Sequence, residues 1–229
     1  IIGGHEGAGI VEAVGPEVTT VAVGDHVAMS FMPSCGRCPS CVKGQSYICD
    51  EGAKLFNTGM MGDDRMAHKI GDTAAARMTQ LGTFADHMLL SEDSVVKVAD
   101  DIPFPQAALV SCGVATGYNS AVSRADTQPG DTVVVIGAGG VGMNAIQGAA
   151  IAGAKRVVAV DPEEFKREKA MEMGATHTYG SIDEAMAGLG ELTWGQMADR
   201  TIITVGVMKG DLLEPAMNLT GKGGTVVVT

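Results

Sequence analysis

The feature that most constrains the fold is an apolar run that ends directly in a glycine-rich turn, TVVVIGAGGVG at residues 132–142. Four consecutive β-branched residues, 133–136, are typical of a parallel strand buried on both faces. The turn fits G-x-G-x-x-G at Gly137, Gly139 and Gly142, with Gly140 between them, and helical spacing follows. Strand, glycine turn and helix in this order predict a dinucleotide site with the pyrophosphate at the helix N-terminus. An ordinary tight turn is the alternative for such a motif alone.

An acidic residue in the expected place favours the dinucleotide interpretation. The next apolar run, 156–160, ends in Asp161. This lies close to the offset of roughly 20 residues at which an acid accepts the ribose hydroxyls of a dinucleotide. The two signals together predict dinucleotide binding.

Composition limits the classes of partner. The 229 residues are enough for one large or two modest domains, and 45% hydrophobic residues with 32 glycines indicate an α/β protein with many tight turns. A net charge of -11 argues against nucleic acid or an anionic membrane as the main partner. No apolar run approaches the roughly 18 residues that span a bilayer. These properties fit a cytoplasmic enzyme.

The ends of the chain suggest a fragment. Ile1 is not an initiator Met, and the residues after it lack a signal-peptide pattern, so we expect the true N-terminus to lie upstream. The last predicted strand is the fifth of a sheet that would need one more βα unit to reach six strands. We therefore expect truncation at the C-terminus as well.

Four of the five cysteines are clustered, and Gly36, Pro39 and Gly44 between them let the chain wrap around one centre. A closed structural zinc site takes four thiolates in a tetrahedron. Two local disulfides are disfavoured by reducing cytosolic conditions, and an iron–sulfur cluster is a further alternative. The sequence predicts a structural zinc bound by Cys35, Cys38, Cys41 and Cys49.

Other reactive side chains are ambiguous from their pattern alone. His5 lies beside Glu6, but a single histidine near a strand is more often hydrogen-bonded structure than a ligand. Cys112 stands apart from the cluster, and an isolated buried cysteine usually behaves as a small hydrophobe.

The predicted elements fall into two groups. Short strands at 10–14, 27–29, 83–90 and 94–98 suggest a small β-rich domain, interrupted by a partly irregular excursion over 50–80 and followed by a helix over 103–121. Beyond residue 131, strands at 132–136, 156–160, 175–179, 201–205 and 225–228 alternate with helices. This alternation predicts an α/β, doubly wound parallel sheet.

Four motifs in register resemble the zinc-containing medium-chain alcohol dehydrogenases. They are GHE-x2-G-x5-G-x2-V from residue 4, the four-cysteine lobe, CG-x2-TG from residue 112, and the glycine turn. The resemblance implies a GroES-like catalytic domain over 1–117, N-terminally incomplete, with its structural-zinc lobe at about 35–49. It also implies a C-terminally incomplete Rossmann NAD-binding domain over 118–229, with the active site in the cleft between the two.

The resemblance also assigns roles to single residues. A catalytic zinc would take His5 and Cys112 as ligands, with Glu6 behind the metal, and a further cysteine and a proton relay are expected before Ile1. The remaining positions would contact substrate or NAD: Phe31 as a wall of the substrate pocket, Thr116 and Val141 against the nicotinamide, Asp161 on the adenosine ribose, and Lys166 either near that ribose or on a solvated helix face.

The implied activity is zinc-dependent hydride transfer between an alcohol or aldehyde and NAD. The segments 81–84, 174–177, 201–206 and 222–225 look closest to the nicotinoprotein alcohol dehydrogenases, whose NAD stays bound and is recycled by an external electron acceptor. Two alternatives remain, a formaldehyde dehydrogenase acting on a glutathione or other thiol adduct, and a catalytically silent relative that binds nucleotide and zinc. A homo-oligomer in the cytoplasm is expected.

Overall fold

A computed structural model describes residues 1–52 and 68–229. Contacts within the chain divide it into two compact units, Ile1–Cys112 and Gly113–Thr229. The family-based boundary after residue 117 stays a prediction. Each unit is described below by itself.

The first unit is built on a small antiparallel sheet in the order β1-β2-β5. Its central strand is the most buried, because Val27, Ala28 and Met29 are less than a tenth exposed. The expected β-rich character of this part of the chain is confirmed. The elements that the structure describes here are β1 (Ala8–Ile10), β2 (His26–Met29), α1 (Pro39–Val42), η1 (Ser46–Ile48), β3 (His68–Ile70), β4 (Thr73–Ala75), η2 (Met78–Gln80), η3 (Glu92–Ser94) and β5 (Val95–Lys97).

Two details of the first unit differ from expectation. The strand predicted over 83–90 is wrong: this segment is irregular, and Phe84 is 83% exposed. Its backbone instead supports the N-terminal loop, since the amides of Thr83 and Phe84 donate to carbonyls of that loop. The first strand also lies earlier than predicted, at Ala8–Ile10. Within the excursion predicted over 50–80, residues 68–75 form the β3–β4 hairpin, and residues 53–67 lie outside the described residues.

The helix predicted over 103–121 is present but is not uniform. It consists of α3 (Phe104–Leu109), the π-helical η4 (Val110–Val114), α4 (Ala115–Asn119) and the π-helical η5 (Ser120–Arg124). Pro105 lies in the first turn, where its missing N–H leaves no helical bond unmade. Cys112 lies in the first π-helical segment, a distortion that is often found at functional sites.

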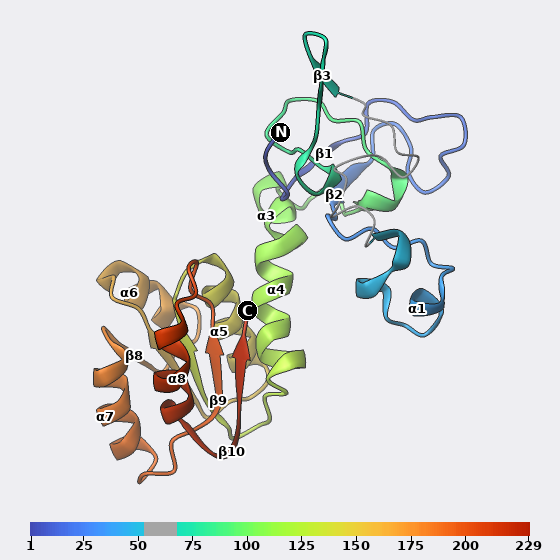
Figure 1. Ribbon diagram of the computed structural model, residues 1–229. Coiled ribbons are helices and arrows are strands. Elements are labelled where there is room, and N and C mark those ends of the chain that lie inside the picture. The colour runs from blue at the N-terminus through green and yellow to red at the C-terminus, as the bar shows by residue number, and fades with distance from the viewer. Residues whose placement is uncertain (53–67) are drawn as a thin grey trace. The chain divides into compact units, whose positions relative to one another are not determined.

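The second unit is the predicted doubly wound sheet. Five parallel strands lie in the order β10-β9-β6-β7-β8, with helices on both faces (Figure 1). The strands are β6 (Thr132–Ile136), β7 (Arg156–Val160), β8 (His177–Tyr179), β9 (Ala198–Ile203) and β10 (Thr220–Val228), and the helices are α5 (Gly140–Ile151), α6 (Glu164–Glu172), α7 (Ile182–Leu192) and α8 (Leu213–Leu219), with the turn η6 (Gly210–Leu212) before α8. No helix among the residues described is long and apolar enough to cross a membrane.

The core of this unit explains the continuous apolar run of β6. Val133 and Val135 pack on one face with residues of α5 and α6. Val134 and Ile136 pack on the other face with residues of α7 and α8. Since both faces of β6 are covered, every one of its residues is buried, as the sequence predicts.

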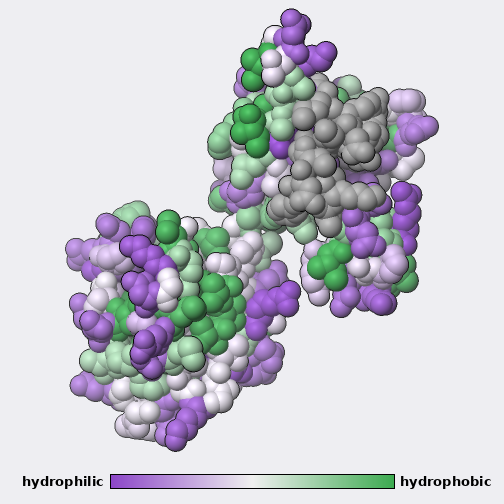
Figure 2. Space-filling model, viewed as in Figure 1, coloured by the Kyte–Doolittle hydropathy of each residue, from purple (hydrophilic) through white to green (hydrophobic). Residues whose placement is uncertain are grey.

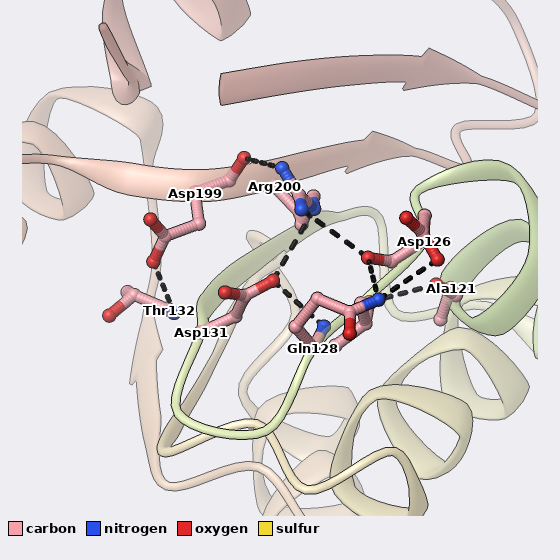
Figure 3. A network of polar contacts seen from close by, with 8 residues as sticks. Ala121, Asp126, Gln128, Asp131, Thr132, Asp199 and Arg200 are labelled. Atoms are coloured by element: carbon pink, nitrogen blue, oxygen red, sulfur yellow. Dashed lines mark hydrogen bonds and ion pairs between the residues drawn. The ribbon is translucent and has the colours of Figure 1, made fainter. Parts of the chain in front are cut away.

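A polar network fixes the start of β6, at the sheet end opposite the glycine turn (Figure 3). An Asp199 carboxylate oxygen accepts the Thr132 amide at 2.8 Å. The Arg200 guanidinium lies 3.3 Å from the Asp131 carboxylate and donates to the Asp126 carbonyl. Two adjacent residues of β9, Asp199 and Arg200, therefore hold the turn that leads into β6. These contacts fix the position of β6 along the sheet, and with it the position of the glycine turn that follows.

One edge of the sheet is open within the part of the chain described. Strand β10 pairs with β9 on one side only, and Val228 near its end is 54% exposed. Met217, on the preceding helix, is 64% exposed. Figure 2 shows hydrophobic surface gathered on this side of the second unit. Unpaired strand backbone beside apolar side chains is surface that packing against further protein would bury.

Candidate metal centres and dinucleotide site

The loop that carries His5 and Glu6 is held tightly on its N-terminal side. The Gly4 carbonyl accepts the amide of Thr83 at 3.1 Å. Gly4 has φ +92°, and a Cβ there would lie 2.3 Å from the Thr83 hydroxyl. Only glycine fits this conformation and this contact, which explains the glycine directly before the histidine.

The C-terminal side of the same loop is fixed as well. The Gly7 carbonyl accepts the Met29 amide of β2 at 2.9 Å and the Ser111 hydroxyl at 3.4 Å. A Cβ at Gly7 would lie 2.7 Å from the Met29 sulfur. The glycines on both sides of His5 and Glu6 therefore seat this loop between β2, the irregular segment around Thr83 and the η4 turn.

These contacts bring three candidate ligands together. The donor atoms of His5, Glu6 and Cys112 all lie within 4.8 Å of one another, and all three side chains are partly buried. Imidazole, thiolate and carboxylate are the donors that zinc binds, so the chemistry of this group fits a zinc ion. Cys112 is thus not simply a core residue. The fold brings it next to His5, although the two residues are 107 positions apart in the sequence.

Phe31 lies beside this group. Its ring centroid is 5.5 Å from that of His5, and the two rings meet edge to face at 86°. An aromatic side chain here limits how the imidazole can turn and adds an apolar surface next to the donor atoms. Its role as a pocket wall stays a prediction.

The four clustered cysteines converge as predicted. Their sulfur atoms lie within 4.8 Å of one another. The Cys49 sulfur is 3.6 Å from that of Cys35 and 3.9 Å from that of Cys38. Since each sulfur has several near neighbours, the arrangement is that of one four-sulfur site, and it fits a tetrahedral zinc better than two separate disulfides.

Local backbone structure produces this convergence. Cys38 is the N-cap of α1, with Pro39 in the first helical turn. Gly36 and Gly44 have φ +70° and +78°, which lets the chain reverse on each side of that turn. Backbone amides of the lobe donate to the sulfur atoms, among them Cys35 to Cys49 at 3.4 Å.

These amides change the acidity of the thiols. Burial raises the pKa of Cys49, but hydrogen bonds from the amides of Cys35 and Gly52 outweigh it and lower the pKa to about 6. The Asp50 amide lowers the pKa of Cys38, while burial raises that of Cys41 to about 12. Part of the cluster is therefore ready to ionise near neutral pH, as metal binding requires.

The glycines of the turn after β6 have two different tasks. Gly137 has φ +96°, and a Cβ at Gly142 would lie 1.8 Å from the Gly137 carbonyl oxygen, so these two glycines close the turn. A Cβ at Gly139 or Gly140 would meet nothing within 4 Å. The space beside them is open, as the backbone approach of a pyrophosphate requires. Gly139 also caps α5 without any side-chain bond, which leaves the first amides of the helix available to an anion.

Asp161 is placed against this turn. Its side chain is buried, and its Oδ2 accepts the Ala138 amide at 2.8 Å while Oδ1 accepts the Glu163 amide at 3.0 Å. The Lys166 ammonium lies 3.7 Å from Oδ1. Lys166 is therefore close to the predicted ribose-binding acid, and its role toward the ribose stays a prediction.

Thr116 and Val141 belong to neighbouring helices of the second unit. Gly117 makes this approach possible, because a Cβ there would lie 2.1 Å from the Val141 carbonyl oxygen. The Thr116 carbonyl accepts the Ser120 hydroxyl at 2.7 Å. Gly117 of the sequence motif thus lets α4 pack directly on the start of α5.

One contact of the glycine turn comes from a residue outside the predicted site. The Thr204 hydroxyl donates to the Gly137 carbonyl at 2.6 Å. Thr204 directly follows β9, the neighbour of β6, and ends of adjacent parallel strands meet at one edge of a sheet. A polar residue directly after the apolar run of β9 is the sequence signal that indicates such a contact.

Two family models match the chain in succession. Residues 1–100 match the alcohol dehydrogenase GroES-like domain, and residues 140–229 match the zinc-binding dehydrogenase domain. A relative from Amycolatopsis methanolica, named NDMA-dependent alcohol dehydrogenase, is 53% identical over the whole chain. The chain belongs to the zinc-containing medium-chain alcohol dehydrogenase family.

Further relatives are similar over nearly the whole chain. Alcohol dehydrogenase B of Mycobacterium tuberculosis is 49% identical over all of the chain. Among solved structures, a zinc-binding-domain alcohol dehydrogenase from Burkholderia ambifaria covers 99% of the chain with a TM-score of 0.87 and 32% identity. Benzyl alcohol dehydrogenase from Acinetobacter calcoaceticus covers all of the chain with a TM-score of 0.82 and 31% identity. The chain spans 61–62% of the length of these four relatives.

Proposed function

We propose that the protein containing this chain is a zinc-dependent oxidoreductase that transfers hydride between an alcohol or aldehyde and NAD. The observation that carries the proposal is the convergence of His5, Glu6 and Cys112 in a chain that also has an open glycine turn backed by Asp161. Neither a structural zinc site nor a nucleotide-binding fold alone would require His5, Glu6 and Cys112 to lie together. The names of the relatives support the same activity.

The residues of the first unit would bind the metal and the substrate. His5 and Cys112 would hold a zinc ion, which when bound supplies Lewis-acid polarisation of the alcohol oxygen. Glu6 lies close enough to balance charge at that position. Phe31 restrains His5 and offers an apolar wall, and the four-cysteine lobe would hold a second, structural zinc.

The residues of the second unit would bind NAD. Open space at Gly139 and Gly140 and the free amides of α5 suit the pyrophosphate. Asp161 would accept the adenosine ribose hydroxyls, and its negative charge would repel the additional phosphate of NADP. Val141 and Thr116 would pack against the nicotinamide.

We propose further that NAD is retained and reoxidised by an external acceptor. The support is the 53% identity to the NDMA-dependent enzyme over the whole chain. The alternatives are a formaldehyde dehydrogenase acting on thiol adducts and a silent relative. A homo-oligomer and a cytoplasmic location stay predictions from the sequence.

Cofactor retention separates these possibilities. Denaturing the purified full-length protein is expected to release about one NAD(H) per chain, and benzyl alcohol with NDMA should then turn over without added NAD. Release of no NAD(H), with turnover that depends on added NAD, would contradict retention but not the NAD-linked reaction. Activity restricted to formaldehyde with glutathione would favour the thiol-adduct enzyme. Bound nucleotide and zinc without turnover of any alcohol would favour the silent relative.

A further inference from the structure

A single peptide unit of the glycine turn is held from both sides. The carbonyl of Gly137 accepts the Thr204 hydroxyl at 2.6 Å, and the amide of Ala138, in the same peptide plane, donates to Asp161 Oδ2 at 2.8 Å. Thr204 follows β9 and Asp161 follows β7, the two strands that flank β6. The first peptide of the turn is thus fixed by the side chains that directly follow both neighbouring strands.

The contact of Thr204 is close and specific. Its hydroxyl has one proton and lies 2.6 Å from the Gly137 carbonyl oxygen, against 3.2 Å from that of Ile136. The Ile136 carbonyl already accepts the Thr204 amide at 2.9 Å. The hydroxyl therefore donates its proton to the Gly137 carbonyl oxygen, since the Ile136 oxygen already has the Thr204 amide as a donor.

The same contact determines where the carbonyl points. A Cβ on Gly142 would lie 1.8 Å from the Gly137 oxygen and 2.8 Å from the Thr204 hydroxyl, so the oxygen faces Gly142 and Thr204. A Cβ on Gly139 would meet no atom within 4 Å, so the oxygen is not turned into the open space there. A carbonyl oxygen in that space would repel a phosphate, whereas amides attract it.

We propose that Thr204 is a positioning residue for the pyrophosphate of the dinucleotide. Its hydroxyl holds the Gly137–Ala138 peptide in the orientation that keeps the carbonyl away from the anion. This inference rests on the proposed NAD-binding function and extends it to a residue outside the glycine motif. A turn fixed before binding loses less conformational freedom on binding, so the hydroxyl should act on affinity as well as on stability.

The role of Thr204 is separable from that of Asp161. Asp161 would bind the ribose directly, and its replacement should weaken every ligand that contains adenosine. Thr204 acts through the turn, so its replacement should weaken only ligands that contain the pyrophosphate. ADP-ribose and adenosine distinguish the two, because only the first has that group.

The test compares three variants of the full-length protein, freed of bound nucleotide, by calorimetric titration with ADP-ribose and with adenosine. Thr204→Val keeps the β-branched shape and removes the hydroxyl, and we expect it to raise the Kd for ADP-ribose about tenfold while that for adenosine changes little. Thr204→Ser keeps the hydroxyl and should restore the affinity for ADP-ribose. Thr201→Val is the matched control. Thr201 is fully buried in β9, the strand that Thr204 follows, and its hydroxyl accepts the Thr220 hydroxyl at 2.8 Å, away from the turn.

The outcomes are distinct. A Thr204→Val protein that binds ADP-ribose like the wild type, or that loses adenosine and ADP-ribose affinity equally, overturns the inference and leaves the proposed function intact. A control that weakens ADP-ribose as much as Thr204→Val also overturns it, since general loosening of β9 would then suffice. A wild-type protein that binds neither NADH nor ADP-ribose removes the proposed function and the inference together. Thr204→Ala tests the same loss with less bulk if the valine variant does not fold.

Discussion

Replacing Cys112 by serine in the full-length protein is expected to remove one of two zinc ions and nearly all alcohol turnover, with the fold unchanged. The Cys112 sulfur is one of three donor atoms gathered within 4.8 Å, and a serine hydroxyl is a poor zinc ligand. Loss of Lewis-acid activation should lower turnover by about 10³-fold or more. Metal analysis of the purified protein and steady-state kinetics on the same sample check both parts.

Cys41→Ser is the matched control for this prediction. It removes one thiolate from the structural lobe, so it should also lower the zinc content from two to one. Its expected effect is on stability, because the segment around Cys35–Cys49 has little apolar core of its own: Cys49 is the buried hydrophobic residue there. If the wild-type protein contains a single zinc and Cys41→Ser abolishes it while Cys112→Ser does not, a catalytic metal at His5 and Cys112 is excluded.

Two alanine substitutions in the glycine turn are expected to act in opposite ways. Gly142→Ala would place a methyl group 1.8 Å from the Gly137 carbonyl oxygen and 2.8 Å from the Thr204 hydroxyl, so the backbone of the turn would have to shift. We expect a loss of about 3 kcal/mol or more in the free energy of unfolding. Gly139→Ala meets no atom within 4 Å and has φ −83°, which alanine adopts freely, so the stability of the fold should change little.

The same Gly139→Ala variant should lose dinucleotide affinity. Its methyl group would occupy the space in which the pyrophosphate is proposed to lie, and we expect the Kd for NADH to rise about 100-fold. Urea unfolding and NADH fluorescence titration measure the two effects on each variant. A Gly139→Ala protein that binds NADH as tightly as the wild type would show that the open space is not where the cofactor binds.

Local patterns were sufficient for much of the second unit. The β6 strand matches its predicted bounds because an unbroken apolar run is compatible only with burial on both faces. Helix α6 ends just before Gly174, whose φ of +110° is the left-handed conformation that glycine favours after a helix. In the first unit, alternation misled: residues 83–90 have a strand-like pattern, but their amides bond to the loop of Gly3 and Gly4 instead of to a sheet edge.

Short-range patterns encode the glycine turn, the four-cysteine lobe and the alternating strands and helices, because each depends on residues close together in the chain. Long-range packing is what brings Cys112 beside His5 and Glu6, and what places Thr204 and Asp161 on either side of one peptide of the turn. These contacts join residues far apart in sequence, and no local pattern encodes the distance between them. It is the packing of β2, η4 and the irregular segment around Thr83 in one unit, and of β9, β6 and β7 in the other, that sets it.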